Sequence, residues 1–196
     1  MDARPIMKRR EALVPLLKDP SEAVRLAAAH ALERLEGMGS LDEILDALKK
    51  GGLAAKIAAI YALGKIGGDS VLHPLIYCIS RPEEDIKSAA IEVLGNLAHP
   101  AALTHLIGKL QDANPAIKAK AIAALANFRG PSLVKLLLPF LDANDGLLDA
   151  EAALALGKIG DCRLEGRLVQ LLRSPHPRSR EAAALALGQL PFDQKP

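Results

Sequence analysis

The stretch Ala155-Leu156-Gly157-Lys158-Ile159-Gly160 decides how this sequence should fold. The same six residue types stand at Ala62-Leu63-Gly64-Lys65-Ile66-Gly67, three periods of 31 residues earlier. A shift of 31 aligns one leucine in every unit without a gap, at Leu32, Leu63, Leu94, Leu125, Leu156 and Leu187. Four residues before it stands an alanine column, Ala28, Ala59, Ala90, Ala121, Ala152 and Ala183. A fixed period of this size indicates a repeat array, and six units cover roughly residues 10–195.

The apolar spacing predicts two helices in every unit. In the first half of a unit, apolar residues lie four apart, as at Leu13 and Leu17. In the second half they lie at i, i+4, i+7, i+8 and i+11, as at Val24, Ala28, Ala31, Leu32 and Leu35. Both patterns follow the helical period of 3.6 residues. Between the halves, Asn114-Pro115 has the order of a helix cap followed by proline.

A single helical hairpin of this size cannot bury its apolar face, so successive hairpins must stack. We therefore predict an all-α fold, a right-handed α-α superhelix (alpha solenoid) of six 31-residue helical hairpins. A single repeat domain over residues 10–196 is expected to follow an N-terminal segment, residues 1–9. Its repeats are expected at about 10–40, 41–71, 72–102, 103–133, 134–164 and 165–195.

Composition excludes several functional classes. The 196 residues carry 25 Lys and Arg against 23 Asp and Glu, a net charge of +2 with no basic half, so nucleic-acid binding over the whole surface is not expected. No apolar run reaches the ~18 residues of a membrane span. Cys78 and Cys162 form no CxxC motif, and no secretory signal follows Met1. These features predict a cytoplasmic protein.

The repeats resemble HEAT repeats, especially the short PBS-lyase HEAT-like variant. The residues that carry the resemblance are Asp19-Pro20-Ser21-Glu22-Ala23-Val24-Arg25, Pro74-Leu75-Ile76 and the two quoted Ala-Leu-Gly-Lys-Ile-Gly segments. The resemblance covers nearly the whole chain and implies the solenoid fold. It does not imply one function, because such repeats occur in scaffolds, bilin lyase subunits, hydroxylases and DNA-repair proteins.

The sequence provides no pattern for catalysis or metal binding. HEAT-like hydroxylases hold iron with His-Glu pairs, but the histidines here precede alanine, proline or leucine, at His30, His73, His99, His105 and His176. HEAT-like glycosylases use tryptophan, which this chain lacks. We therefore expect no catalytic residue, no metal and no cofactor. A bilin-lyase-like enzyme subunit or chaperone is the alternative, and nucleic-acid binding by local basic clusters is a weaker one.

In HEAT-like arrays the second helices line the concave side, which implies where a partner would bind. The helical wheel places a mixed set of apolar and polar residues opposite the buried arc. The predicted partner-binding residues are Leu26, His30, Ile57, Tyr61, Lys65, Glu92, Asn96, Asn127, Leu154, Lys158 and Leu185. They suit a helix or segment of another protein, which predicts a non-catalytic scaffold or adaptor. Packing of Leu147 and Leu154 against adjacent repeats is an open alternative.

Three further features of the repeats each allow two interpretations. A glycine column, Gly64, Gly95, Ala126, Gly157 and Gly188, would admit a ligand backbone or accommodate helix curvature. A basic column, Arg25, Lys56, Lys87, Lys118, Asp149 and Arg180, is expected to be mostly structural, with a minor role in partner contact. In the family this column pairs with loop aspartates, which here are present at Asp19 and Asp112. The last helix exposes alanine, so a homodimer through the array ends, or a longer array, is the third hypothesis.

Overall fold

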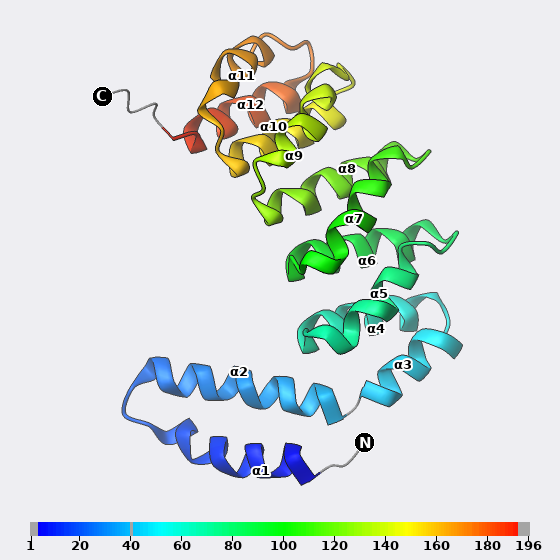
Figure 1. The fold of residues 1–196 in the computed structure, drawn as a ribbon, viewed down its shortest axis with the longest axis vertical. Helices are drawn as coiled ribbons and strands as arrows, with labels where there is room; N and C mark the ends of the chain where they lie inside the picture. The colour runs from blue at the N-terminus through cyan, green and yellow to red at the C-terminus, as the bar shows by residue number, and fades with distance from the viewer. Residues whose placement is uncertain (1–3, 40, 192–196) are drawn as a thin grey trace. The chain divides into compact units, whose positions relative to one another are not determined.

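The computed structural model describes residues 4–39 and 41–191, and Figure 1 shows that they form a succession of helices joined by short loops. The described residues contain twelve α-helices and no strand, with short 3-10 segments at several helix ends. The chain divides into two compact units, Met1–Cys78 and Ile79–Pro196. We describe each unit separately.

The first unit contains two complete hairpins and one further helix. Its helices are α1 (Arg4–Leu13), α2 (Glu22–Gly39), α3 (Leu41–Lys50), α4 (Leu53–Ile66) and α5 (Leu72–Cys78). Helix α1 packs on α2, and α3 packs on α4. Residues 4–9, which were expected to precede the first hairpin, belong to α1.

The second unit repeats the same hairpin. Its helices are α6 (Glu84–Leu97), α7 (Pro100–Gly108), α8 (Pro115–Leu125), α9 (Ser132–Leu137), α10 (Leu148–Ile159), α11 (Glu165–Leu171) and α12 (Pro177–Gln189). The second helices of successive repeats, α6, α8, α10 and α12, pack against one another in order. Each of α7, α9 and α11 covers the helix that follows it.

Helix ends form where the sequence supplies the required groups. At the start of α8, Asn114 Oδ1 accepts a hydrogen bond from the Ala116 N–H at 2.8 Å, and Pro115 occupies the first helical position. Gly160 ends α10 with a φ of 80°, a left-handed conformation that glycine adopts without strain. The predicted cap at Asn114 is therefore present, and a glycine ends α10.

The repeat columns form the core. The whole alanine column is buried, which lets the helices approach closely. The leucine column is buried from Leu32 to Leu156, and Leu187 in the last helix is half-buried. Each fully buried leucine contributes about 1.5–3 kcal/mol relative to an exposed one.

The glycine column serves packing between helices in the second unit. A Cβ atom on Gly95 would lie 2.5 Å from Ala124 Cβ, and one on Gly157 would lie 2.6 Å from Ala186 Cα. Both distances are too short for carbon atoms in contact, so only glycine allows these helices to approach as they do. At Gly95 and Gly157 the space is filled by the next repeat, and the alternative of an approaching ligand backbone is wrong there.

Candidate functional site

The predicted partner-binding residues of the first unit lie on α2 and α4. Leu26 is 55% exposed and Tyr61 is 42% exposed, and the side chains of His30 and Lys65 are also exposed. Ile57 is half-buried. Exposure of large apolar side chains on these helices leaves them available for contact with another molecule.

Half of the predicted partner-binding residues of the second unit are exposed, and the other half are partly buried by neighbouring residues. Leu185 on α12 is 53% exposed, and Asn96 and Lys158 are exposed as well. Glu92, Asn127 and Leu154 are half-buried. The half-burial of Leu154 is compatible with the alternative that its side chain packs against adjacent repeats.

Several of the polar candidates bind neighbouring repeats. Lys120 Nζ donates to Glu92 Oε2 at 2.9 Å, and Asn127 Nδ2 donates to the Gly95 carbonyl oxygen at 2.9 Å. Lys158 Nζ donates in turn to Asn127 Oδ1. These bonds join α6 to α8 and the end of α8 to α10, so they form a polar ladder between repeats.

Polar contacts between repeats also occur within the first unit. Lys65 Nζ lies 3.8 Å from Glu33 Oε1, and Arg34 Nε donates to the Ile66 carbonyl oxygen at 3.2 Å. A helical wheel represents one isolated helix, so these contacts between helices could not be predicted from it. The separations of 28 to 32 residues between partners, close to the repeat period, were the available signal.

One exposed apolar residue on the second helices was absent from the prediction. Leu53 is 48% exposed at the start of α4. With Ile57 and Tyr61 it forms an i, i+4, i+8 series, which places the three side chains along one side of the helix. We call Leu53, Ile57 and Tyr61 the α4 stripe. The signal in the sequence was that the residues equivalent to Leu53 are Glu22, Glu84, Pro115, Gly146 and Pro177.

The basic column has a structural role at several positions. Lys87 Nζ donates to Asp112 Oδ2 at 3.2 Å, and both side chains are largely buried. Partial burial opposes ionisation of Asp112, but the Asn114 N–H and the Lys87 ammonium outweigh it and lower the pKa of the Asp112 carboxyl. Arg25 and Arg180 instead donate to carbonyl oxygens of the loops before their own helices.

Asp149 is the acidic exception in the basic column. It is 0% exposed, its Oδ2 accepts a hydrogen bond from Ser179 Oγ at 3.0 Å, and its Oδ1 accepts one from the Ala150 N–H at 2.9 Å. The carboxylate lies at the N-terminal end of α10, where the helix dipole favours negative charge. Asp149 therefore links α10 to α12.

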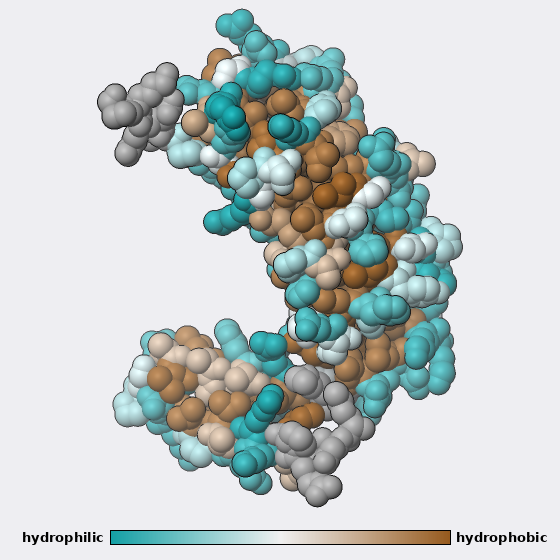
Figure 2. Space-filling view, viewed as in Figure 1, coloured by the Kyte–Doolittle hydropathy of each residue, from teal (hydrophilic) through white to brown (hydrophobic). Residues whose placement is uncertain are grey.

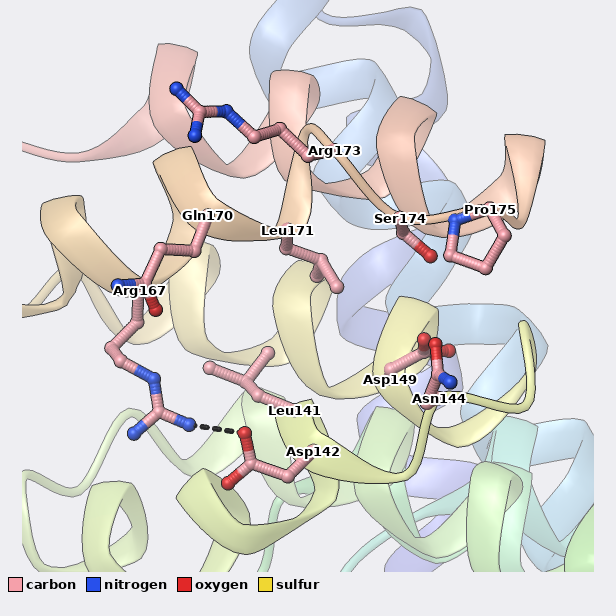
Figure 3. A pocket seen from close by; sticks show the side chains of 10 residues that line it. All are labelled: Leu141, Asp142, Asn144, Asp149, Arg167, Gln170, Leu171, Arg173, Ser174 and Pro175. Carbon is pink, nitrogen blue, oxygen red and sulfur yellow. Dashed lines mark hydrogen bonds and ion pairs between the residues drawn. The ribbon is translucent and has the colours of Figure 1, made fainter.

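A pocket of about 360 Å³ lies beside Asp149 in the second unit, between residues 141–149 and residues 167–175. Figure 3 shows Leu141 and Leu171 at its centre and the ion pair between Arg167 and Asp142 at its edge. The lining also includes Asp149, but that side chain has no exposed surface. The lining is mixed, because Asn144, Gln170, Arg173 and Ser174 also border the pocket beside the leucines and the ion pair, and we assign no reaction to it.

Three of the six basic residues between 158 and 180 form ion pairs with carboxylates. Arg163 donates to both carboxylate oxygens of Asp161 and lowers the pKa of that carboxyl. Arg167 pairs with Asp142, and Arg178 pairs with Glu151. These pairs neutralise half of the local positive charge that contact with a phosphate backbone would use.

The histidines occupy capping or exposed positions. His99 Nδ1 accepts a hydrogen bond from the Ala101 N–H at the start of α7, and His176 Nε2 lies 3.0 Å from the Asn144 carbonyl oxygen. Within residues 4–39 and 41–191, no group of three His, Cys, Asp or Glu side chains is arranged to hold a metal ion.

No helix in the described part of the chain is long and apolar enough to cross a membrane.

Helical hairpins with a repeating core define the class of protein as an alpha solenoid, as predicted. A family model described as HEAT repeats matches residues 10–87, 72–147 and 134–195. The chain therefore belongs to the HEAT-repeat family, and the PBS-lyase-like subtype stays a prediction.

A solved structure supports the fold assignment. The chain is similar to the crystal structure of an engineered protein from the Northeast Structural Genomics Consortium, with 21% identity and a TM-score of 0.55. The similarity covers 92% of this chain and 96% of that one. No curated protein matches the sequence.

Proposed function

We propose that this protein is a non-catalytic scaffold that binds a segment of another protein along its second helices. The observation that carries the proposal is the α4 stripe, in which Leu53 and Tyr61 remain exposed on a helix whose other face is buried in the core. Exposed apolar residues in a connected stripe favour a binding surface over a solvated helix face.

The chemistry of the stripe specifies the kind of partner. Leu53 and Ile57 offer apolar contact, and Tyr61 adds a hydroxyl group that can hydrogen-bond at the edge of an interface. Lys65, one further turn along, lies beside Glu33, so the charge at this end of the stripe is balanced within the chain. An amphipathic helix with aliphatic residues on one face fits this pattern.

Leu26 and His30 on α2 extend the proposed surface within the first unit, and Leu185 on α12 offers a second contact in the other unit. Asn96 on α6 and Lys158 on α10 would add polar contacts in that unit. We place the protein in the reducing cytoplasm, because its two cysteines form no CxxC motif and no disulfide scaffold.

The test is affinity capture from the native lysate with quantitative mass spectrometry. Wild type is compared with Tyr61→Ala and with Tyr77→Ala, a matched control because Tyr77 is also exposed but lies on the first helix α5. We expect a protein partner that wild type and Tyr77→Ala retain and that Tyr61→Ala loses by about tenfold, a typical cost of removing an interface tyrosine. Equal loss by both tyrosine variants, or by neither, would contradict the proposal.

A further inference from the structure

The outer face of the last described hairpin, α11 and α12, is built like the faces that are buried between hairpins. Gly188 stands in the glycine column with Gly95 and Gly157. A Cβ atom on either of those two glycines would collide with an alanine of the next repeat, whereas one on Gly188 meets nothing within 4 Å. Gly188 therefore presents the same close-packing position with no neighbouring helix against it among the described residues.

Apolar residues surround this position. Val169 on α11 and Leu172, the residue after this helix, are both exposed. Among the residues equivalent to Leu172 by the 31-residue period, Ile79, Leu110 and Leu141 in the second unit are buried, whereas in the first unit Leu48 is half-buried and Leu17 is exposed. Ala184 is exposed, whereas its equivalents in the second unit, Ile91, Ile122 and Ala153, are buried. We call Val169, Leu172, Ala184 and Gly188 the tail face.

The first hairpin carries the complementary surface. Ala31 on α2 is equivalent to Ala124 and Ala186, the two alanines that contact Gly95 and Gly157. It borders a hollow of about 450 Å³, lined by Arg9, Ala12, Leu13, Ala31, Arg34 and Leu35, which we call the head face. Figure 2 shows hydrophobic surface over α1 and α2.

The two ends of the array also carry complementary charges, an arginine in the last repeat and an aspartate in the first. Between adjacent repeats, Lys87 of the basic column donates to Asp112 Oδ2, while Asp112 Oδ1 accepts from the Asn114 N–H at 3.0 Å. Arg180 and Asp19 stand in these same two columns.

Asp19 is already arranged like Asp112. Its Oδ1 accepts a hydrogen bond from the Ser21 N–H at 2.8 Å, and within residues 4–39 and 41–191 its other carboxylate oxygen has no hydrogen-bond donor. Arg180 uses Nη1 for the carbonyl oxygens of Ser174 and Pro175, which leaves its Nη2 and Nε groups as donors. The acidic and basic partners of one inter-repeat pair are thus present on the head and tail faces respectively.

We infer that the chain associates with a second copy head to tail, the tail face of one molecule docking on the head face of the next. In this arrangement Gly188 contacts Ala31 of the second copy, and Arg180 pairs with Asp19 of the second copy. The interface repeats the packing that α10 and α12 make inside one chain. Because the two surfaces differ, the interface is heterologous, so a docked pair of molecules keeps one free head face and one free tail face for further copies.

Sedimentation velocity over a range of micromolar concentrations tests the inference. Wild type should show a weight-average mass that rises with concentration. Gly188→Leu should weaken association by at least about tenfold, because its side chain would overlap Ala31 of the second copy. Gly166→Leu is the matched control, since Gly166 is also an exposed helical glycine with open space around it but lies off the tail face. It should associate like wild type.

Charge reversal gives an independent test that does not depend on close packing. Arg180→Glu and Asp19→Arg should each weaken self-association, because each places like charges together at the interface. An equal mixture of the two variants should regain association, because Glu at position 180 then meets Arg at position 19. A wild type that stays monomeric, equal effects of the two glycine variants, or no recovery in the mixture would overturn the inference.

The two proposals can fail separately. Tyr61 lies outside both faces, so Tyr61→Ala should leave the concentration dependence of the mass unchanged while it removes the captured partner.

Discussion

Asp149 is the acidic member of an otherwise basic column, and its hydrogen-bond partner differs from that of the equivalent lysine. The equivalent Lys87 extends to a loop aspartate in the next repeat, but the residue that stands in the place of Asp112 is Ser174. Asp149 instead accepts a hydrogen bond from Ser179 on α12. Burial of a carboxylate without hydrogen-bond donors costs several kcal/mol of folding free energy. The aspartate at position 149 therefore depends on the serine at position 179.

Removal of either partner should therefore destabilise the second unit. Ser179→Ala should lower the free energy of unfolding by about 1–3 kcal/mol, because it removes a donor from a buried charge. Asp149→Ala should also destabilise, and the double variant should lose less than the sum of the single losses. Urea denaturation of the four proteins measures the coupling, and additive losses would show that the two side chains act independently.

The pair between Lys87 and Asp112 should make stability depend on pH in the acid range. The folded-state pKa of Asp112 lies below its ordinary value of 3.8, so the unfolded chain binds the proton more readily. The stabilisation is present above pH 3.8 and is lost as pH falls through the lowered folded-state pKa. The difference in unfolding free energy between wild type and Asp112→Asn should shrink over that window. A difference that stays constant or grows as pH falls would contradict this assignment.

Helix elements in this chain meet at positions where side-chain size is limiting. Gly157 and Gly166 are both helical glycines, but the first faces Ala186 across an inter-repeat contact and the second faces open space. Gly157→Leu should destabilise by about 2–3 kcal/mol through overpacking. Gly166→Leu should change stability by less than about 1 kcal/mol, or increase it slightly through better helix propensity. Thermal unfolding separates these outcomes, and equal melting temperatures would refute the packing role of Gly157.

Much of the element structure could be predicted from the sequence, because the 31-residue period repeats the same hydrophobic pattern six times. The buried alanine column follows directly from it. The candidate site was harder to predict, because the exposure of a residue such as Lys65 or Asn127 depends on the repeat beside it. A wheel for an isolated helix contains no information on that neighbour. Leu53 was missed because its column, which begins at Glu22, lies outside the arc that the helical wheel places opposite the core.

At the scale of the whole molecule, stability should vary along the repeats. Leu94, Leu125 and Leu156 are fully buried in the second unit, whereas Leu17 is exposed and Leu13 is half-buried near the start of the first. In a repeat array each hairpin depends mainly on its neighbours, so poorly covered hairpins open first. Native-state hydrogen exchange should be slowest in α8 and α10 and faster in α1 and the first half of α2. Uniform protection across all hairpins would contradict this expectation.

The central claim is that the second helices, and the α4 stripe in particular, bind another protein. Hydrogen exchange of the protein alone and in complex with its captured partner tests this most directly. We predict added protection in the peptides that cover α4, residues 53–66, with no change in the first helices α5 and α7. Protection confined to the first helices, with α4 exchanging as in the free protein, would contradict the claim.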